Sequence, residues 1–155
     1  MKKIAFIFPG QGAQSVGMGK DIYEAFDTAK NVYETADKVL GYSISDICFN
    51  GPEEELKQTI NTQPAILTTS LACLEVLRKE INMEPAAVAG HSLGEYGALY
   101  TAGVLSLEWD INRGLDKDEN AELIENLLKK LDIHKLINDI LNCTQFGFQP
   151  LEIMW

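Results

Sequence analysis

The stretch from Ala87 to Tyr96, AVAGHSLGEY, organises the whole chain. Its first four residues predict a short buried strand, and the residues that follow the turn predict a helix running to about Gly103. Ser92 lies two residues from Gly90 and two from Gly94, which is the G-x-S-x-G pattern of a nucleophile elbow. A strand-to-helix turn this tight brings neighbouring backbone close to the flanking positions, so glycine is required there.

The elbow predicts a chemical role for Ser92. The turn holds the hydroxyl at the end of the sheet and aims the first amides of the helix at the space above it, where they can stabilise an oxyanion. The same pattern also occurs in ordinary turns, and that interpretation stays open. The apolar run before the motif and the helical run after it favour the nucleophile.

Composition limits the classes of function. The chain has 155 residues, 46% of them hydrophobic and 23% charged, which suits one soluble globular domain with a core. The formal net charge of −10 argues against nucleic acid or an anionic membrane as a partner. Cys48, Cys73 and Cys143 are scattered, which indicates reduced thiols in a cytoplasmic protein. With only two histidines, no conventional metal site is expected, and no segment is long enough to span a bilayer.

The amino-terminal apolar run, Ile4 to Phe8, predicts a central strand of a parallel sheet that is buried on both faces. The loop that follows, Pro9 to Gln14, has glycines spaced for a close approach to a ligand, and Gln11 is one of its two polar side chains. A plain glycine-rich turn is the alternative. A phosphate loop is not expected because no Gly-Lys-Ser/Thr follows.

Helical patterns fill the region between the two predicted strands. Apolar residues recur every three to four positions from Lys20 to Leu40, and Gly41 is expected to end that helix. Pro52 opens a short acidic helix. A largely buried helix is expected from Thr62 to about Ile81, with Gln63 near its start as either a cap or a site residue. The order of elements predicts an α/β fold, a parallel sheet with flanking helices whose site lies at the carboxyl ends of the strands.

The character of the chain changes after Gly103. Leu105 to Ile111 alternates like a strand, and helical periodicity from Glu119 predicts a mainly helical carboxyl-terminal segment. The last ten residues are apolar and strand-like, so the terminus is expected to be a cut end.

Three motifs together resemble malonyl-CoA:acyl carrier protein transacylases. They are FPGQGAQ at residues 8–14, TQPA at 62–65 and GHSLGEY at 90–96, and the resemblance covers about residues 1–105. It implies a partial acyltransferase fold of the hydrolase-like type with a nucleophile elbow. It also implies the reaction, which moves a malonyl group from coenzyme A to a serine and then to acyl carrier protein, in fatty acid biosynthesis.

The resemblance assigns roles by position. Ser92 matches the acyl-accepting serine, and the backbone amides of Gln11 and Leu93 match the oxyanion hole. Gln63 matches a glutamine of the substrate pocket, and His91 belongs to the serine motif without being the general base. The expected partners are malonyl-CoA, as a thioester substrate rather than a cofactor, and acyl carrier protein. No metal, nucleic acid or membrane is implied.

Some parts of the family's pattern have no match. The resemblance implies a histidine base and an arginine for the malonyl carboxylate beyond the serine. Arg113 lacks the surrounding pattern, and His134 falls on a predicted amphipathic helix of a different context. Whether the chain is an active enzyme is therefore left open.

The last third resembles part of a Mu-like phage portal protein, on residues 105–111 and 137–155. The expected organisation is a transacylase-like part, 1–105, followed by a divergent helical segment, 106–155. The leading hypothesis is an acyltransferase. The alternatives are a catalytically incomplete fragment, or a chimera with a phage portal segment, without turnover.

Overall fold

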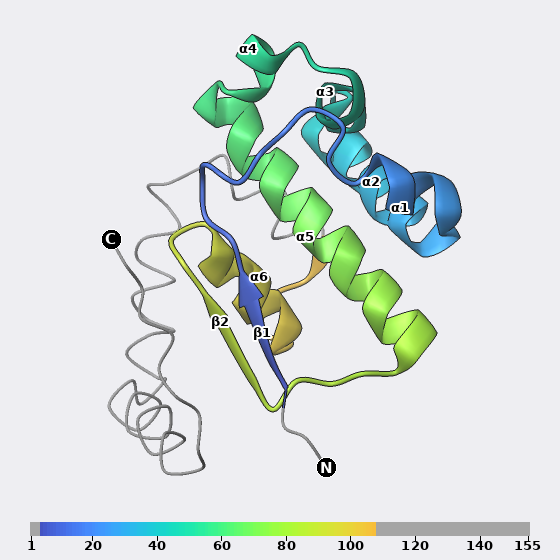
Figure 1. Ribbon diagram of the computed structural model, residues 1–155, viewed down its shortest axis with the longest axis vertical. Helices are drawn as coiled ribbons and strands as arrows, with labels where there is room; N and C mark the ends of the chain where they lie inside the picture. Colours follow the sequence, from blue (N-terminus) through green and yellow to red (C-terminus); the bar gives the residue numbers. More distant parts are fainter. Residues whose placement is uncertain (1–3, 108–155) are drawn as a thin grey trace. The chain divides into compact units, whose positions relative to one another are not determined.

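The computed structural model describes residues 4–107 and shows a small parallel sheet packed on helices (Figure 1). These residues fall in the first of two units into which the chain divides, Met1–Leu115. The elements in chain order are β1 (Ala5–Phe8), α1 (Lys20–Ala25), α2 (Asp27–Leu40), α3 (Ile44–Asn50), α4 (Glu53–Leu56), α5 (Thr59–Ile81), β2 (Ala87–Gly90) and α6 (Gly94–Thr101). The strand expected from Leu105 to Ile111 is not formed over its described part, residues 105–107. The rest of that stretch and the helices expected after it lie outside the described residues.

The two strands pair in parallel, with Ala5 opposite Ala87 and Phe8 opposite Gly90. Their carboxyl ends therefore meet at one edge, where the chain continues into the loop after β1 and the turn after β2. Helix α6 packs against both strands, and α5 runs alongside (Figure 1). The predicted α/β architecture with a parallel sheet is confirmed for this part of the chain.

The expectation that the first strand is buried on both faces is wrong for the described residues. Phe8 is 7% exposed, whereas its neighbour Ile7 is 78% exposed. Side chains of a strand alternate between the two faces of the sheet, and here the helices cover the face that holds Phe6 and Phe8. The other face, with Ala5 and Ile7, is open among residues 4–107.

The single helix expected from Lys20 to Leu40 is interrupted at Phe26. That residue has extended dihedrals (φ −133°, ψ 120°), and a new helix begins at Asp27. The Phe26 ring packs against the core. Gly41 ends α2 with φ 74°, as predicted, and its amide bonds the Asp37 carbonyl oxygen.

Helix α3 has no counterpart in the sequence-based expectation, because it spans only two turns between Ser43 and Gly51. The Ser43 hydroxyl accepts a hydrogen bond from the Asp46 amide at 3.3 Å, which caps the helix. The Asp37 carboxylate of α2 accepts one from the Ser45 amide at 2.9 Å. These contacts lock α3 onto the end of α2.

Helix α5 begins at Thr59, one turn earlier than predicted, and continues through the buried Pro64. Two polar residues of its first turn donate hydrogen bonds to the backbone of the preceding segment, α4. The Asn61 side-chain amide donates to the Glu55 carbonyl oxygen at 3.0 Å, and the Thr62 hydroxyl donates to that of Leu56 at 2.6 Å. The start of α5 is therefore fixed by tertiary contacts that no local pattern reveals.

The core lies among α2, α3 and α5. The Tyr33 ring contacts those of Tyr23 and Phe49 at centroid distances of 5.8 and 4.9 Å, and its hydroxyl lies 2.7 Å from the Thr69 hydroxyl. Cys48 is fully buried beside them, and this burial raises the pKa of its thiol to about 12.

None of the helices within residues 4–107 has the length and hydrophobicity needed to cross a bilayer.

Candidate active site

Ser92 stands in the three-residue turn between β2 and α6, and its backbone is left-handed, with φ 54°. Few residues other than glycine adopt this conformation, and it is the strained strand-to-helix turn of a nucleophile elbow. The strand and the helix predicted on either side of Ser92 are confirmed. The expectation that this strand is buried is wrong, because Ala87 and Ala89 are exposed. Ser92 is exposed.

The two flanking glycines are required by close packing. A Cβ atom on Gly90 would overlap the carbonyl of Gly94, so the turn closes on itself only when residue 90 has no side chain. A Cβ on Gly94 would overlap the Phe8 carbonyl oxygen and lie 3.0 Å from that of Pro9. The start of α6 therefore rests directly on the backbone at the end of β1.

The loop after β1 lies beside the turn. A Cβ on Gly10 would lie 2.8 Å from the carbonyl oxygen of His91 and 2.9 Å from its Nδ1. The His91 amide also donates to the Phe8 carbonyl oxygen at 3.4 Å. Gln11 follows Gly10 directly, so the structure brings the loop that holds Gln11 next to His91 and Ser92.

The expected oxyanion hole concerns two backbone amides, those of Gln11 and Leu93. The Leu93 side chain is 5% exposed and anchors the amino-terminal end of α6. Among the described residues, neither the Leu93 amide nor the Gln11 amide donates a backbone hydrogen bond. Amides at a helix start that have no intrahelical acceptor attract anions.

The side chains of Gln11 and Gln63 are also joined. Gln63 Nε2 donates to Gln11 Oε1 at 3.3 Å, and Gln11 Nε2 donates to the Thr59 hydroxyl at 3.4 Å. Thr59 and Gln63 are four residues apart on α5, so they share one face of that helix. Sequence reasoning missed Thr59 because it placed the helix start after it; the i, i+4 spacing to Gln63 was the available signal.

His91 contributes to the turn through its backbone. Its carbonyl oxygen accepts a hydrogen bond from the Gly94 amide at 2.9 Å, and its ring lies against Gly10.

Within residues 4–107, no group of three or more His, Cys, Asp or Glu side chains is close enough together to hold a metal ion. Arg113 and His134, weighed above for missing roles, lie outside the described residues.

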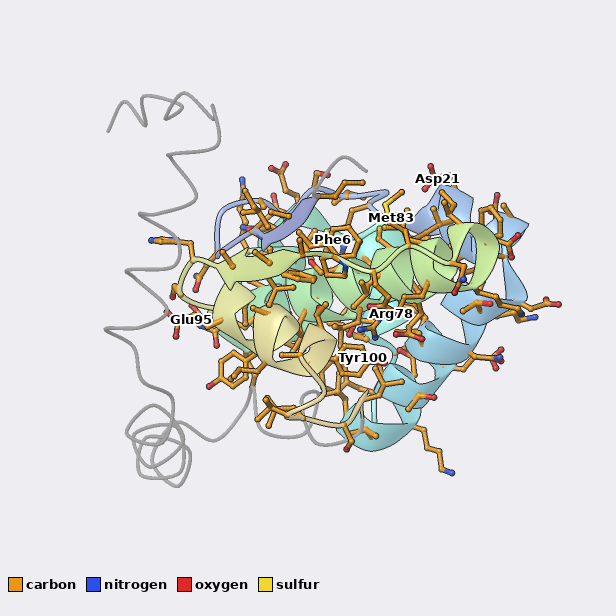
Figure 2. The ribbon with its side chains drawn as sticks, turned by 90° about the horizontal axis from the view of Figure 1, so that it is seen from below. Phe6, Asp21, Arg78, Met83, Glu95 and Tyr100 are labelled. Carbon is orange, nitrogen blue, oxygen red and sulfur yellow. The ribbon has the colours of Figure 1, made fainter. Side chains whose placement is uncertain are left out.

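A second polar cluster holds the far end of α6. The Arg78 guanidinium donates to the Thr101 carbonyl oxygen at 2.8 Å and to Glu75 Oε1 at 3.1 Å. The Tyr100 ring lies beside it, 5.8 Å from ring centroid to guanidinium carbon (Figure 2). Helix α6 is thus fixed at its start by glycine contacts with β1 and at its end by a residue of α5.

Comparisons with known proteins agree with this geometry. Residues 5–110 match the family described as "Acyl transferase domain", and residues 98–155 match "Portal protein of Mu bacteriophage". A malonyl CoA-acyl carrier protein transacylase of Bacillus subtilis (strain 168) is 53% identical over 108 residues, covering 70% of this chain and 34% of that protein. A second Bacillus subtilis protein of that name is 48% identical over 155 residues, covering 98% of this chain and 36% of its own length.

A solved structure is also similar to this chain. It is a malonyl-transacylase in complex with its type II PKS acyl-carrier protein, and it superposes with a TM-score of 0.71 at 41% sequence identity. The match covers 74% of this chain and 37% of that one. The chain therefore spans about a third of the length of the relatives it matches.

Proposed function

Because the chain belongs to the acyl transferase domain family, we propose that it transfers a malonyl group from coenzyme A to acyl carrier protein through an acyl-serine on Ser92, a step of fatty acid biosynthesis. The observation that supports this most is the left-handed Ser92 at the start of α6, with the Gln11 loop packed beside it. That combination offers a nucleophile and oxyanion donors at one place.

The proposed reaction has two half-reactions. In the first, Ser92 Oγ attacks the thioester carbonyl carbon of malonyl-CoA, the carbon–sulfur bond breaks, and the hydroxyl proton ends on the sulfur of free coenzyme A. In the second, the carrier's phosphopantetheine thiol attacks the malonyl ester, and its proton returns to Ser92. The proposed chemistry uses two thioesters and one serine ester, and it needs no further cofactor.

The Gln11 and Leu93 amides are the proposed oxyanion hole in both steps. Each attack places negative charge on the carbonyl oxygen, and preorganised amides stabilise that charge more than they stabilise the neutral ground state. Removing one such donor from an enzyme costs about 10²–10³ in rate. Both donors are backbone groups, so only substitutions that move the backbone would test them.

Gln63 and His91 are proposed as substrate-binding residues. The hydrogen bond from Gln63 to Gln11 supports a role in holding the loop over the bound acyl group. His91 packs at the base of the same loop. We place the reaction in the cytoplasm, where the free thiols of Cys48 and Cys73 would stay reduced.

The test is the intact mass of the chain after incubation with malonyl-CoA. A single malonyl adduct is expected, absent in Ser92→Ala and present in Ser15→Ala, which changes an exposed serine of the loop after β1. The proposal that Ser92 is the nucleophile would be refuted by an adduct that persists in Ser92→Ala. It would also be refuted if no adduct forms on a chain that circular dichroism shows to be folded.

A second candidate is a chain that has the transacylase elbow but no turnover. The match of residues 98–155 to a phage portal family favours it, and with it the proposed division into a transacylase-like part, 1–105, and a divergent segment, 106–155. Transfer of the malonyl group onward to holo acyl carrier protein separates the two candidates. Adduct formation without onward transfer would support the second.

A further inference from the structure

The loop after β1 is attached to the rest of the fold at both ends. At one end Gly10 lies against His91, and at the other the Gly17 amide donates to a backbone carbonyl oxygen of α3 at 2.8 Å. Among the described residues, the hydrogen bonds that join residues 11–16 to other elements both come from the Gln11 side chain. These two bonds are therefore the polar contacts that position the middle of the loop.

The Gln11 side chain is held between two residues that lie one turn apart on α5. Its Nε2 donates to the Thr59 hydroxyl at 3.4 Å, and its Oε1 accepts from Gln63 Nε2 at 3.3 Å. The loop passes over the first turns of α5 (Figure 1), so the side chain reaches that helix directly. Both polar ends of one carboxamide are thus bonded to a single helix.

The start of α5 is a firm support for these contacts. The buried side chains of Asn61 and Thr62 donate hydrogen bonds to the backbone of α4, which fixes the first turn of the helix. Thr59, by contrast, is exposed, and its hydroxyl takes no part in those bonds. Removing that hydroxyl should therefore loosen the loop while it leaves the helix in place.

The same loop carries the Gln11 backbone amide, which the proposed function makes an oxyanion donor. Such a donor works only when it lies about 2.7–3.1 Å from the oxyanion, and a misplacement of about 1 Å can cost about 10² in rate. A side chain bonded at both polar ends limits the rotation of the peptide group to which it is joined. We propose, on the basis of the proposed function, that Thr59 is a positioning residue for acyl transfer. It acts through the Gln11 side chain and holds the Gln11 amide where the oxyanion forms.

The experiment measures the rate of malonyl adduct formation on the full chain, by intact mass, over a range of malonyl-CoA concentrations. Thr59→Val, which removes the hydroxyl and keeps the branched shape, should lower the saturating rate about threefold. One hydrogen bond changes an equilibrium by about two- to twelvefold, and an exposed bond of 3.4 Å belongs at the lower end. The half-saturating concentration should change by less than about twofold, because the donor binds the transition state more tightly than the substrate. Thr59→Ser should restore the rate.

A double-mutant cycle shows whether Thr59 acts through Gln11. Gln11→Met removes the side-chain carboxamide and keeps the backbone amide, so Thr59→Val should cost nothing further in that variant. An equal loss in both backgrounds would overturn the proposal, because Thr59 would then act by another route. Thr35→Val is the matched control, since it makes the same change on α2 at a residue outside the Gln11 contacts, and it should leave the rate unchanged.

Loop order is measured in the same variants by nuclear magnetic resonance relaxation, which needs no reaction. Thr59→Val should lower the order parameter of the Gln11 amide from about 0.85 toward about 0.6 and leave that of Leu93 at its wild-type value. Thr59→Ala replaces Thr59→Val if circular dichroism shows that the valine variant does not fold.

Two results would overturn the proposal: an unchanged order parameter for Gln11, or a wild-type rate of adduct formation in Thr59→Val. The absence of any adduct on the wild-type chain would instead refute Ser92 as the nucleophile. In that case the relaxation data would still decide whether Thr59 holds the loop.

Discussion

Replacing Gly94 by alanine tests whether the contact between α6 and β1 builds the elbow. The new Cβ would overlap the Phe8 carbonyl oxygen and lie 2.8 Å from the Phe8 carbonyl carbon and 3.0 Å from the Pro9 carbonyl oxygen. All three are backbone atoms, so no side chain can rotate away. Since carbon atoms pack best at about 3.5–4.0 Å, α6 must move off β1 by about 1 Å.

The expected cost follows from that displacement. Overpacking a core commonly costs about 1–3 kcal/mol, and a clash with backbone belongs at the upper end, so we expect a loss of about 3 kcal/mol. For a chain of 155 residues, that lowers the melting temperature by about 6–12 °C. The assay is thermal and urea unfolding of the full chain, followed by circular dichroism.

Gly103→Ala is the matched control. Gly103 has φ 73°, and a Cβ there would meet no atom within 4 Å, so its only cost is the left-handed backbone, about 1–2 kcal/mol. Gly94→Ala should therefore destabilise the chain more than Gly103→Ala. The reverse order, or a wild-type melting temperature for Gly94→Ala, would refute the reasoning. If Gly94→Ala still folds, malonyl adduct formation should slow by about 10², the usual cost of a 1 Å misplacement.

Three further predictions concern the helices behind the site. Arg78→Met should lower the free energy of unfolding by about 2 kcal/mol, since it removes the bonds to the Thr101 carbonyl oxygen and to Glu75 and leaves a carbonyl unpaired; an unchanged urea midpoint would contradict this. Iodoacetamide should label the exposed Cys73 well before the buried Cys48 in peptide mapping, and equal rates would show that the core opens freely. The Cys48 thiol has a folded pKa of about 12 against an ordinary value of 9.0, so its share of stability is intact below pH about 9 and is lost as the pH rises toward 12. Unfolding measured from pH 8 to 11 should show a shallower decline in Cys48→Ala, and parallel curves would argue against this assignment.

The elbow was predictable because its signals are local. Small residues before Gly90, glycines around Ser92 and a helical run after Gly94 all describe one turn, and the structure shows the strand, the left-handed serine and the helix. The parallel pairing followed from the same order of elements. The roles of Ser92, Gln11, Leu93, Gln63 and His91 stay predictions, as does the division at residue 105.

Other features depend on contacts that no local pattern specifies. The break at Phe26 occurs inside a continuous helical periodicity, at a residue whose ring packs against the core. The early start of α5 depends on Asn61 and Thr62 binding the chain before them. Ile7 belongs to an apolar run that predicts burial on both faces, and only the structure shows which face the described helices leave open. The strand expected from Leu105 to Ile111 is absent over its described part, residues 105–107.

The pairing of β1 with β2 has a consequence for the order of folding. Phe8 and Gly90 are neighbours in the sheet, yet all the chain from α1 to α5 lies between them. Closing so long a loop costs entropy that is recovered only when the strands meet, whereas the contacts of α2 with α3 link segments close in sequence. We therefore expect the helices to gather early and the sheet to close late. The turn that holds Ser92 depends on Gly94 resting on β1, so a nascent chain would acquire its helical core before that turn forms.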